Sequence, residues 1–264
     1  MRSIHTSVPY VCSIRLCLAP SCPVANSPAP VGIIAKLDAL RRDEGLSGLT
    51  RVLSYRFSEE WHDRRLNIRT PRGRISLTDY GEDHPDYIFH EVTPYAAIFA
   101  ALEGHPRTDH DVLVDVGCGM GRVLAAAATK PFRRIIGVEL VQSFVDEARE
   151  NLRRAKPRLR CRDVEVIQAN ALDFEFPDDM TVAHFFNPFR GATLGRVVDK
   201  LKDSLVRVPR TVDVLFANPV FFEEVIAGQE WVRFIREVPW PHRPPMSEPF
   251  HNSYGIYTAK LVGL

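Results

Sequence analysis

A carboxylate and three closely spaced glycines stand together near the middle of the chain. Asp115 closes an apolar run that begins at Val112, and Gly117, Gly119 and Gly121 follow it. Glycines let the backbone approach a ligand closely and adopt conformations that other residues rarely adopt. A strand, a glycine turn and a helix in this order are typical of the first half of a nucleotide-binding βαβ unit.

The spacing of the glycines argues against a dinucleotide. A G-x-G-x-x-G fingerprint counted from Gly117 requires glycine where the chain has Arg122, which disfavours a nicotinamide-dependent oxidoreductase. Asp115 is expected at the end of the strand, facing the ligand, where a carboxylate repels a pyrophosphate and attracts a cation. S-adenosylmethionine has a sulfonium, a free amino group and no phosphate, so we predict that it binds here.

Polar residues also follow the next three predicted strands. In open α/β sheets, ligands bind beyond the carboxyl ends of the strands, so these ends contribute to one site. Glu139 ends the second strand and can accept hydrogen bonds from both ribose hydroxyls. Asn170 and Asn187 follow the third and fourth strands. Asp, Glu, Asn and Asn in this order form a more specific pattern than any one motif.

The chain resembles the class I S-adenosylmethionine-dependent methyltransferases. The run Val-Asp-Val-Gly-Cys-Gly-Met-Gly (114–121), then Gly-Val-Glu (137–139) and Asn-Ala (170–171), is similar to motifs I to III of that family. The resemblance covers residues 111–264. It implies an α/β fold with a Rossmann-like, seven-stranded, mostly parallel sheet and an antiparallel edge hairpin.

The resemblance also implies roles for individual residues. Asp115 and the glycine turn would hold the methionine moiety, Glu139 the ribose, and Asn170 would face the adenine amino group, where the family often has Asp. Residues 90–95 resemble a segment that precedes motif I in a bacterial branch whose fourth strand ends in Phe-Asn-Pro-Phe. In non-SET histone-lysine methyltransferases the equivalent segment folds over the cofactor. The predicted cofactor-binding residues are Thr93, Tyr95, Asp115, Gly117, Cys118, Gly119, Gly121, Glu139, Asn170 and Ala171.

Asn187-Pro188-Phe189 is the predicted catalytic segment. Methyltransferases that act on adenine or glutamine amino groups have Asn/Asp-Pro-Pro-Tyr here, and the Asn carbonyl and a backbone carbonyl accept hydrogen bonds from the amine. This chain has one proline fewer, which weakens the adenine interpretation. We predict a nitrogen acceptor, with a protein lysine or another amine first and nucleic acid second. The alternative is that Asn187 only forms the turn that ends the strand. Much of the catalysis of methyl transfer can come from positioning and desolvation of the acceptor, so a dedicated base is not required.

Other functions and partners stay open at this stage. The chain could bind S-adenosylmethionine without catalysis, and the acceptor could be a protein, a small molecule or RNA. A basic cluster follows the second predicted helix of the nucleotide fold, either as a solvated face or as a nucleic-acid contact. It comprises Arg153, Arg154, Lys156, Arg158, Arg160 and Arg162. The histidines show no metal-ligand spacing, so no metal site is predicted, and most are expected on the surface or in loops.

Hydrophobic periodicity predicts the elements that position these residues. We expect a tail at 1–30, a helical cap and cofactor lid at 31–110, and the methyltransferase domain at 111–264. The predicted helices span 31–42, ending near Gly45, then 49–61, 95–102, 122–129, 141–155 and 194–205. The predicted strands span 112–116, 134–139, 164–168, 181–186, 211–216, 231–238 and 254–262, with a proline-rich loop before the last.

Composition sets broad limits on the protein. The 264 residues are 45% apolar and 25% charged with a net charge of +1, which gives no overall attraction to nucleic acid or membranes. No apolar run is long enough to cross a bilayer. Five cysteines without a C-x-x-C pair favour a reduced, cytoplasmic protein. Residues 1–30 weakly resemble a signal peptide, but a disordered tail or a start codon placed too far upstream is the preferred explanation.

Overall fold

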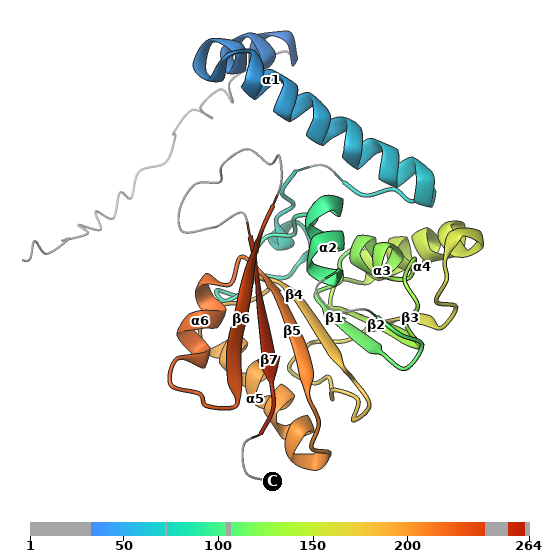
Figure 1. The fold of residues 1–264 in the computed structure, drawn as a ribbon, viewed down its shortest axis with the longest axis vertical. Coiled ribbons are helices and arrows are strands. Elements are labelled where there is room, and N and C mark those ends of the chain that lie inside the picture. Colours follow the sequence, from blue (N-terminus) through green and yellow to red (C-terminus); the bar gives the residue numbers. More distant parts are fainter. Residues whose placement is uncertain (1–32, 72, 104–106, 241–252, 262–264) are drawn as a thin grey trace, which may run out of the picture.

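The computed structural model describes residues 33–71, 73–103, 107–240 and 253–261 (Figure 1). The predicted tail at 1–30 and most of the proline-rich loop before the last strand lie outside these ranges. Within the described ranges, no helix combines the length and apolar character that crossing a membrane requires.

Seven strands form one sheet in the order β3-β2-β1-β4-β5-β7-β6. The first five in this order are parallel, while β7 runs antiparallel between β5 and β6. The predicted Rossmann-like sheet and its antiparallel edge hairpin are therefore confirmed. The strands are β1 (Val112–Val116), β2 (Arg134–Glu139), β3 (Val164–Gln168), β4 (Val182–Phe186), β5 (Val212–Ala217), β6 (Val232–Pro239) and β7 (Ser253–Ala259).

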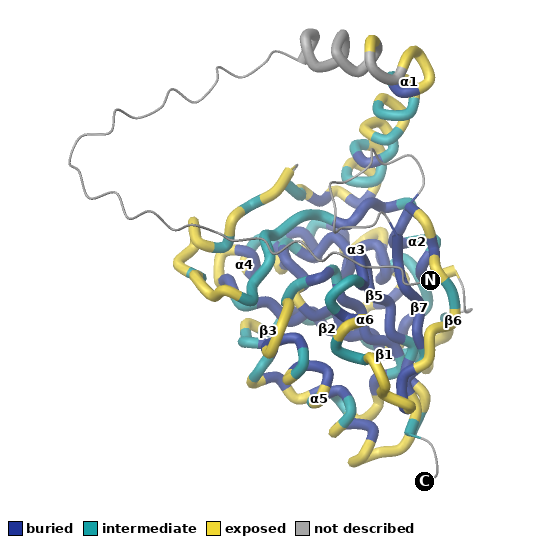
Figure 2. The backbone as a smooth tube through the Cα atoms, turned by 90° about the vertical axis from the view of Figure 1, so that its left-hand side faces the viewer, coloured by how far each residue is buried: buried dark blue, intermediate teal, exposed yellow. Residues whose placement is uncertain are grey.

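Helices cover both faces of the sheet (Figure 1). Residues of α2 (Tyr95–Leu102), α3 (Arg122–Ala127) and α4 (Gln142–Ala155) pack with one face, and α5 (Gly191–Arg207) and α6 (Val220–Ile226) pack with the other. All five residues of β1 are buried, as expected for a central parallel strand with helices on both sides. Figure 2 shows this buried centre beneath more exposed outer helices.

Helix α6 was missing from the sequence prediction. An Asn-Pro pair such as Asn218-Pro219, directly after the fifth strand, is typical of a turn. Asn218 does adopt a turn conformation with φ of 54°, but Pro219 then caps α6. Phe222 on this helix is fully buried, so α6 contributes to the core. Helix α6 has only seven residues, and a hydrophobic pattern over so short a segment does not distinguish a helix from a turn.

The N-terminal helix α1 (Ile33–Leu66) is bent at Gly45, whose φ of 69° and ψ of −165° are not helical. The sequence correctly placed a break at Gly45, and the helix predicted at 49–61 extends to Leu66. This helix projects from the body of the protein and contacts α2 near its C-terminal end (Figures 1 and 2). A short 3-10 turn, η1 (Leu77–Tyr80), follows it before the chain enters the sheet domain.

Candidate functional site

A cleft lies at the carboxyl ends of the parallel strands, and together with the solvent space at its open mouth it spans about 910 Å³. One wall consists of the glycine turn and the ends of β1 and β2. Residues 87–93, which precede α2, form the facing wall. Pro188 and Phe189, which follow β4, also line the cleft.

The glycine turn connects β1 to α3 with the backbone closely packed against its neighbours. Gly119 has φ of 53°, and a Cβ atom built there would lie 2.2 Å from the His90 imidazole. Gly121 has φ of 81°, and its Cβ would lie 3.1 Å from Ala148 on α4. Glycine is therefore required at both positions, for backbone conformation and for space. His90 itself lines the cleft, directly above the turn.

Asp115 is buried, with 2% of its surface exposed, and it lines the cleft. Its Oδ1 lies 2.6 Å from Nδ1 of His184, whereas its Oδ2 is buried without a hydrogen-bond partner. A buried carboxylate oxygen without a partner is costly unless a donor or cation satisfies it. The amino group of S-adenosylmethionine is such a donor, so this side of the cleft fits the cofactor predicted from the sequence.

Glu139 also lines the cleft, and three backbone N–H groups hold its carboxylate. Gly119 donates to Oε2 over 2.9 Å, while Leu140 and Val141 donate to Oε1 over 2.8 and 2.9 Å. Burial raises the pKa of Glu139, and these hydrogen bonds act against that rise. A carboxylate has about four acceptor positions, so about one remains for a ribose hydroxyl rather than the two hydroxyls expected.

Asn170 and Ala171 line the cleft beyond Glu139. The Asn170 side chain accepts a hydrogen bond from the backbone N–H of Leu172 over 2.9 Å and donates to the hydroxyl of Tyr87 over 3.3 Å. Tyr87 belongs to the facing wall, so Asn170 joins the end of β3 to that wall. Its predicted contact with adenine stays a prediction.

The two predicted lid residues lie in different surroundings. Thr93 lines the cleft, but Tyr95 is fully buried and does not. The Tyr95 hydroxyl donates to Asp63 over 2.6 Å, and its backbone N–H donates to Glu59 over 3.0 Å. Tyr95 therefore attaches α1 to α2 and does not reach the cofactor cleft. Burial raises the pKa of its hydroxyl.

Histidines contribute more to this site than the sequence suggested. His184 is buried in β4 rather than exposed, and His90 lines the cleft. Burial and the nearby Arg122 guanidinium lower the pKa of His90 to about 4, so the imidazole is neutral at physiological pH. The nearly continuous apolar run along β4 could have indicated His184, because a histidine inside a strand that is buried on both faces needs polar partners.

The predicted catalytic segment is only partly exposed to the cleft. Pro188 and Phe189 line it, whereas Asn187 is buried and is not among the lining residues. Asn187 has φ of 41°, a conformation in which Asn is enriched, and both polar atoms of its amide lack hydrogen-bond partners. The Pro188 carbonyl accepts a hydrogen bond from the backbone N–H of Ile88 over 3.2 Å.

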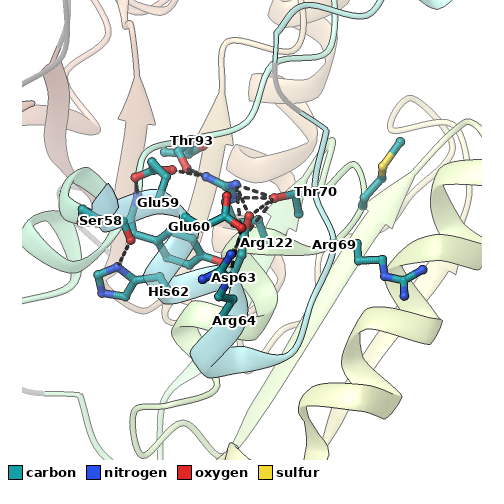
Figure 3. Close-up of polar contacts among 12 residues, drawn as sticks. Ser58, Glu59, Glu60, His62, Asp63, Arg64, Arg69, Thr70, Thr93 and Arg122 are labelled. Carbon is teal, nitrogen blue, oxygen red and sulfur yellow. Dashed lines mark hydrogen bonds and ion pairs between the residues drawn. The ribbon is translucent and has the colours of Figure 1, made fainter. Parts of the chain in front are cut away.

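Arg122 has a role that its sequence position did not reveal (Figure 3). The guanidinium is buried, forms ion pairs with Glu59 and with Asp63, and hydrogen-bonds the Thr70 hydroxyl. It also donates to the backbone carbonyl of Thr93 over 3.4 Å. Arg122 begins α3 directly after the glycine turn, so this cluster joins α1 to the cofactor cleft. The partners lie far apart in sequence and leave no local pattern.

The basic cluster lies at the opposite edge of the sheet from the cleft. Helix α4 begins beyond the carboxyl end of β2 and leads back to the amino end of β3, and the cluster follows its C-terminal half. Arg153 and Arg154 form ion pairs with acidic residues of the same helix over 2.7 Å. The exposed members are Arg153, Lys156, Arg158, Arg160 and Arg162.

A comparison with protein families identifies a known domain in the middle of the chain. Residues 113–207 match the family described as "Methyltransferase domain". A search of curated proteins found no match. Residues 113–207 therefore form a methyltransferase domain, and S-adenosylmethionine is its cofactor.

Solved structures similar to this chain include three methyltransferases. An RNA methyltransferase from Salinibacter ruber, in complex with S-adenosyl-L-homocysteine, is 22% identical with a TM-score of 0.43, over 64% of this chain and 93% of that one. An O-methyltransferase from Bacillus cereus is 16% identical with a TM-score of 0.45, over 65% and 83%. A ribosomal protein L11 methylase from Lactobacillus delbrueckii subsp. bulgaricus is 14% identical with a TM-score of 0.44, over 62% and 76%.

Proposed function

We propose that this methyltransferase acts on a nitrogen atom, in a protein lysine or another amine. The observation that carries the proposal is the Asn187-Pro188-Phe189 segment at the end of β4, whose proline and phenylalanine line the same cleft as Asp115. This is the position from which an acceptor can approach the methionine side of the cofactor site. The Asn-Pro-aromatic pattern is similar to that of amino-group methyltransferases.

The chain's own residues provide positioning and exclusion of water. When bound, S-adenosylmethionine supplies an electrophilic methyl group. Aromatic side chains of the cleft provide an apolar environment for an acceptor. They are Tyr87, Phe89, Phe186 and Phe189. An ammonium group loses hydration in such a place, so burial favours the neutral amine with a free lone pair. Positioning of that amine can account for much of the catalysis without a dedicated base.

Two contacts bear on how the amine would be held. The Pro188 carbonyl accepts the N–H of Ile88, and the Asn187 amide is buried, has no hydrogen-bond partner and does not line the cleft. The Asn187 amide is therefore not at the cleft surface where an amine would bind, whereas the Pro188 carbonyl keeps a second lone pair. The proposal therefore depends on the apolar cleft and on the sequence pattern.

A nucleic-acid acceptor is the second candidate. The exposed members of the basic cluster favour it, since arginines in such number supply phosphate contacts. Their position on the far edge of the sheet counts against it, because a bound strand would have to extend around the domain to reach the cleft. Binding of S-adenosylmethionine without catalysis remains the competing class.

We also propose a cytoplasmic location, which the free thiols of Cys118 and Cys161 support.

A methyl-transfer screen tests the proposal. The purified chain is incubated with S-adenosylmethionine labelled in the methyl group and with protein, RNA and small-molecule fractions of the host. We expect label in protein or in a small amine, and mass spectrometry should identify an N-methyl product. An O-methyl product, or label only in RNA, would overturn the amine proposal. Tight binding of S-adenosylmethionine without transfer to any fraction would favour the non-catalytic class.

A further inference from the structure

Four buried polar side chains form a continuous hydrogen-bonded chain beside the cofactor cleft. His184 Nδ1 lies 2.6 Å from Asp115 Oδ1, and His184 Nε2 lies 2.8 Å from the Tyr254 hydroxyl. The Tyr254 hydroxyl is also hydrogen-bonded to the side chain of Thr93. None of the four exposes more than 3% of its surface. We call Thr93, Tyr254, His184 and Asp115 the buried relay.

The strands fix the order of the buried relay. Asp115 on β1 and His184 on β4 are paired in register, so their side chains leave the same face of the sheet side by side. Tyr254 lies on β7, on the far side of β5, and its long side chain reaches across to the imidazole. Thr93 comes from the segment before α2. The relay thus joins three strands and the facing wall of the cleft.

A neutral His184 with its proton on Nδ1 gives each link of the buried relay one donor and one acceptor. The Asp115 carboxylate only accepts, so His184 Nδ1 carries the proton that it receives. A neutral imidazole then accepts at Nε2, and the Tyr254 O–H donates there. The Tyr254 oxygen can then accept the proton of the Thr93 hydroxyl, to which it is hydrogen-bonded. Every group in the chain is satisfied by this assignment except one, the Oδ2 of Asp115.

Both ends of the buried relay line the cleft, while its two middle members do not. His184 and Tyr254 therefore act on the site only through Asp115 and Thr93. With Oδ1 held by His184, the Asp115 carboxylate cannot turn, and its unpartnered Oδ2 is the oxygen available to a ligand. Fixing a ligand-binding group by a second layer of hydrogen bonds reduces the entropy lost on binding.

We propose that His184 and Tyr254 are positioning residues that hold Asp115 for the amino group of the cofactor. The proposal rests on the cofactor site described above and adds the residues that orient it. It predicts that the buried relay matters only for ligands that carry the amino-acid part of the cofactor. The adenosine part binds elsewhere in the cleft and should not depend on it.

Two substitutions of His184 separate positioning from packing. In His184→Asn, the amide nitrogen occupies the δ position and can still donate to Asp115. In His184→Gln, the amide lies at the ε position, where it can contact Tyr254 but not Asp115. The ligands are S-adenosylhomocysteine, which has the amino group, and 5′-methylthioadenosine, which lacks the amino-acid part. Calorimetric titration gives the dissociation constants, and thermal unfolding verifies that both variants fold.

We expect His184→Gln to weaken S-adenosylhomocysteine about tenfold, the typical effect of a lost hydrogen bond to a charged group. Binding of 5′-methylthioadenosine should be unchanged, and His184→Asn should retain most of the affinity. In an Asp115→Asn background, His184→Gln should have no further effect. Equal weakening of both ligands, or an unchanged affinity for S-adenosylhomocysteine, would overturn the proposal. Failure of the unaltered protein to bind S-adenosylhomocysteine would instead contradict the cofactor site itself.

Discussion

Replacing Arg122 with methionine removes the cation from a buried cluster that joins α1 to the start of α3. The guanidinium pairs with Glu59 and Asp63, and its side chain is only 5% exposed (Figure 3). It also lies 4.6 Å from the centre of the Tyr95 ring. Methionine preserves much of the apolar stem, so Arg122→Met chiefly deletes the charge and its hydrogen bonds.

The expected loss of stability is large because the anions stay behind. Glu59 is 9% exposed at its side chain and Asp63 is 14% exposed. Removing one partner of a buried ion pair costs about 3 to 5 kcal/mol, most of it from the charge left without a partner. Domains of this size have unfolding free energies of about 5 to 15 kcal/mol. Arg122→Met should therefore remove a substantial fraction of the stability.

The loss should depend on pH. Burial raises the pKa of Glu59 above its usual value of 4.5, and the charge of Arg122 acts against that rise. Without Arg122 the pKa of Glu59 rises further, so the folded state binds a proton more tightly than the unfolded state does. That proton-linked stabilisation is fully present below pH 4.5 and is lost as the pH rises through the folded-state pKa. The penalty of Arg122→Met should be smaller near pH 5 than at pH 7.5.

Urea unfolding followed by circular dichroism at both pH values provides the measurement. Arg134→Met is the matched control, because it breaks an ion pair with Glu165 whose side chains are 37% and 40% exposed. It should cost less than about 1 kcal/mol. If Arg122→Met prevents folding, Arg122→Met with Glu59→Gln should restore part of the stability. A loss no larger than that of Arg134→Met, or a loss that grows as the pH falls, would refute the reasoning.

Three further outcomes can be measured. Gly119→Ala should abolish or strongly weaken S-adenosylmethionine binding, because the new methyl group collides with His90. Gly195→Ala is the control and should leave binding unchanged, because no atom lies within 4 Å of the added Cβ. Equal effects of the two substitutions in a binding titration would contradict the site. Asn187→Gly preserves the left-handed backbone conformation and removes the amide. A loss of turnover with an unchanged Kd for S-adenosylmethionine would support a catalytic role of Asn187. Unchanged turnover would show that Asn187 serves only to form the turn. Neutralising the basic cluster should leave methyl transfer to an amine unchanged. A loss of both salt-dependent RNA binding and methyl transfer would instead favour the nucleic-acid acceptor.

The strands were predictable because each central one is buried on both faces. The predominantly apolar runs at 112–116 and 134–139 indicate this, and the structure places β1 and β2 at the same residues. The glycine turn followed from the break in the first run. The cleft position then followed from topology, since parallel strands deliver their carboxyl ends to one edge.

The contacts that complete the site were not predictable. Arg122 and Glu59 are 63 residues apart, and their ion pair depends on how α1 packs against α2. Tyr95 was assigned to the lid by resemblance, but a large side chain at the first position of α2 points into the interior. Asn187 has the sequence context of a substrate clamp, yet the backbone conformation after β4 buries its amide. Side-chain direction is set by the three-dimensional packing, which a short motif does not contain.

The most direct test of the cofactor assignment is calorimetric titration of the purified chain with S-adenosylmethionine, S-adenosylhomocysteine and NAD under the same conditions. The unpartnered oxygen of Asp115 and the glycine turn predict binding of the first two at a single site and no binding of NAD. Asp115→Asn should weaken both without unfolding the protein. Tight binding of NAD, with none of S-adenosylmethionine, would contradict the account.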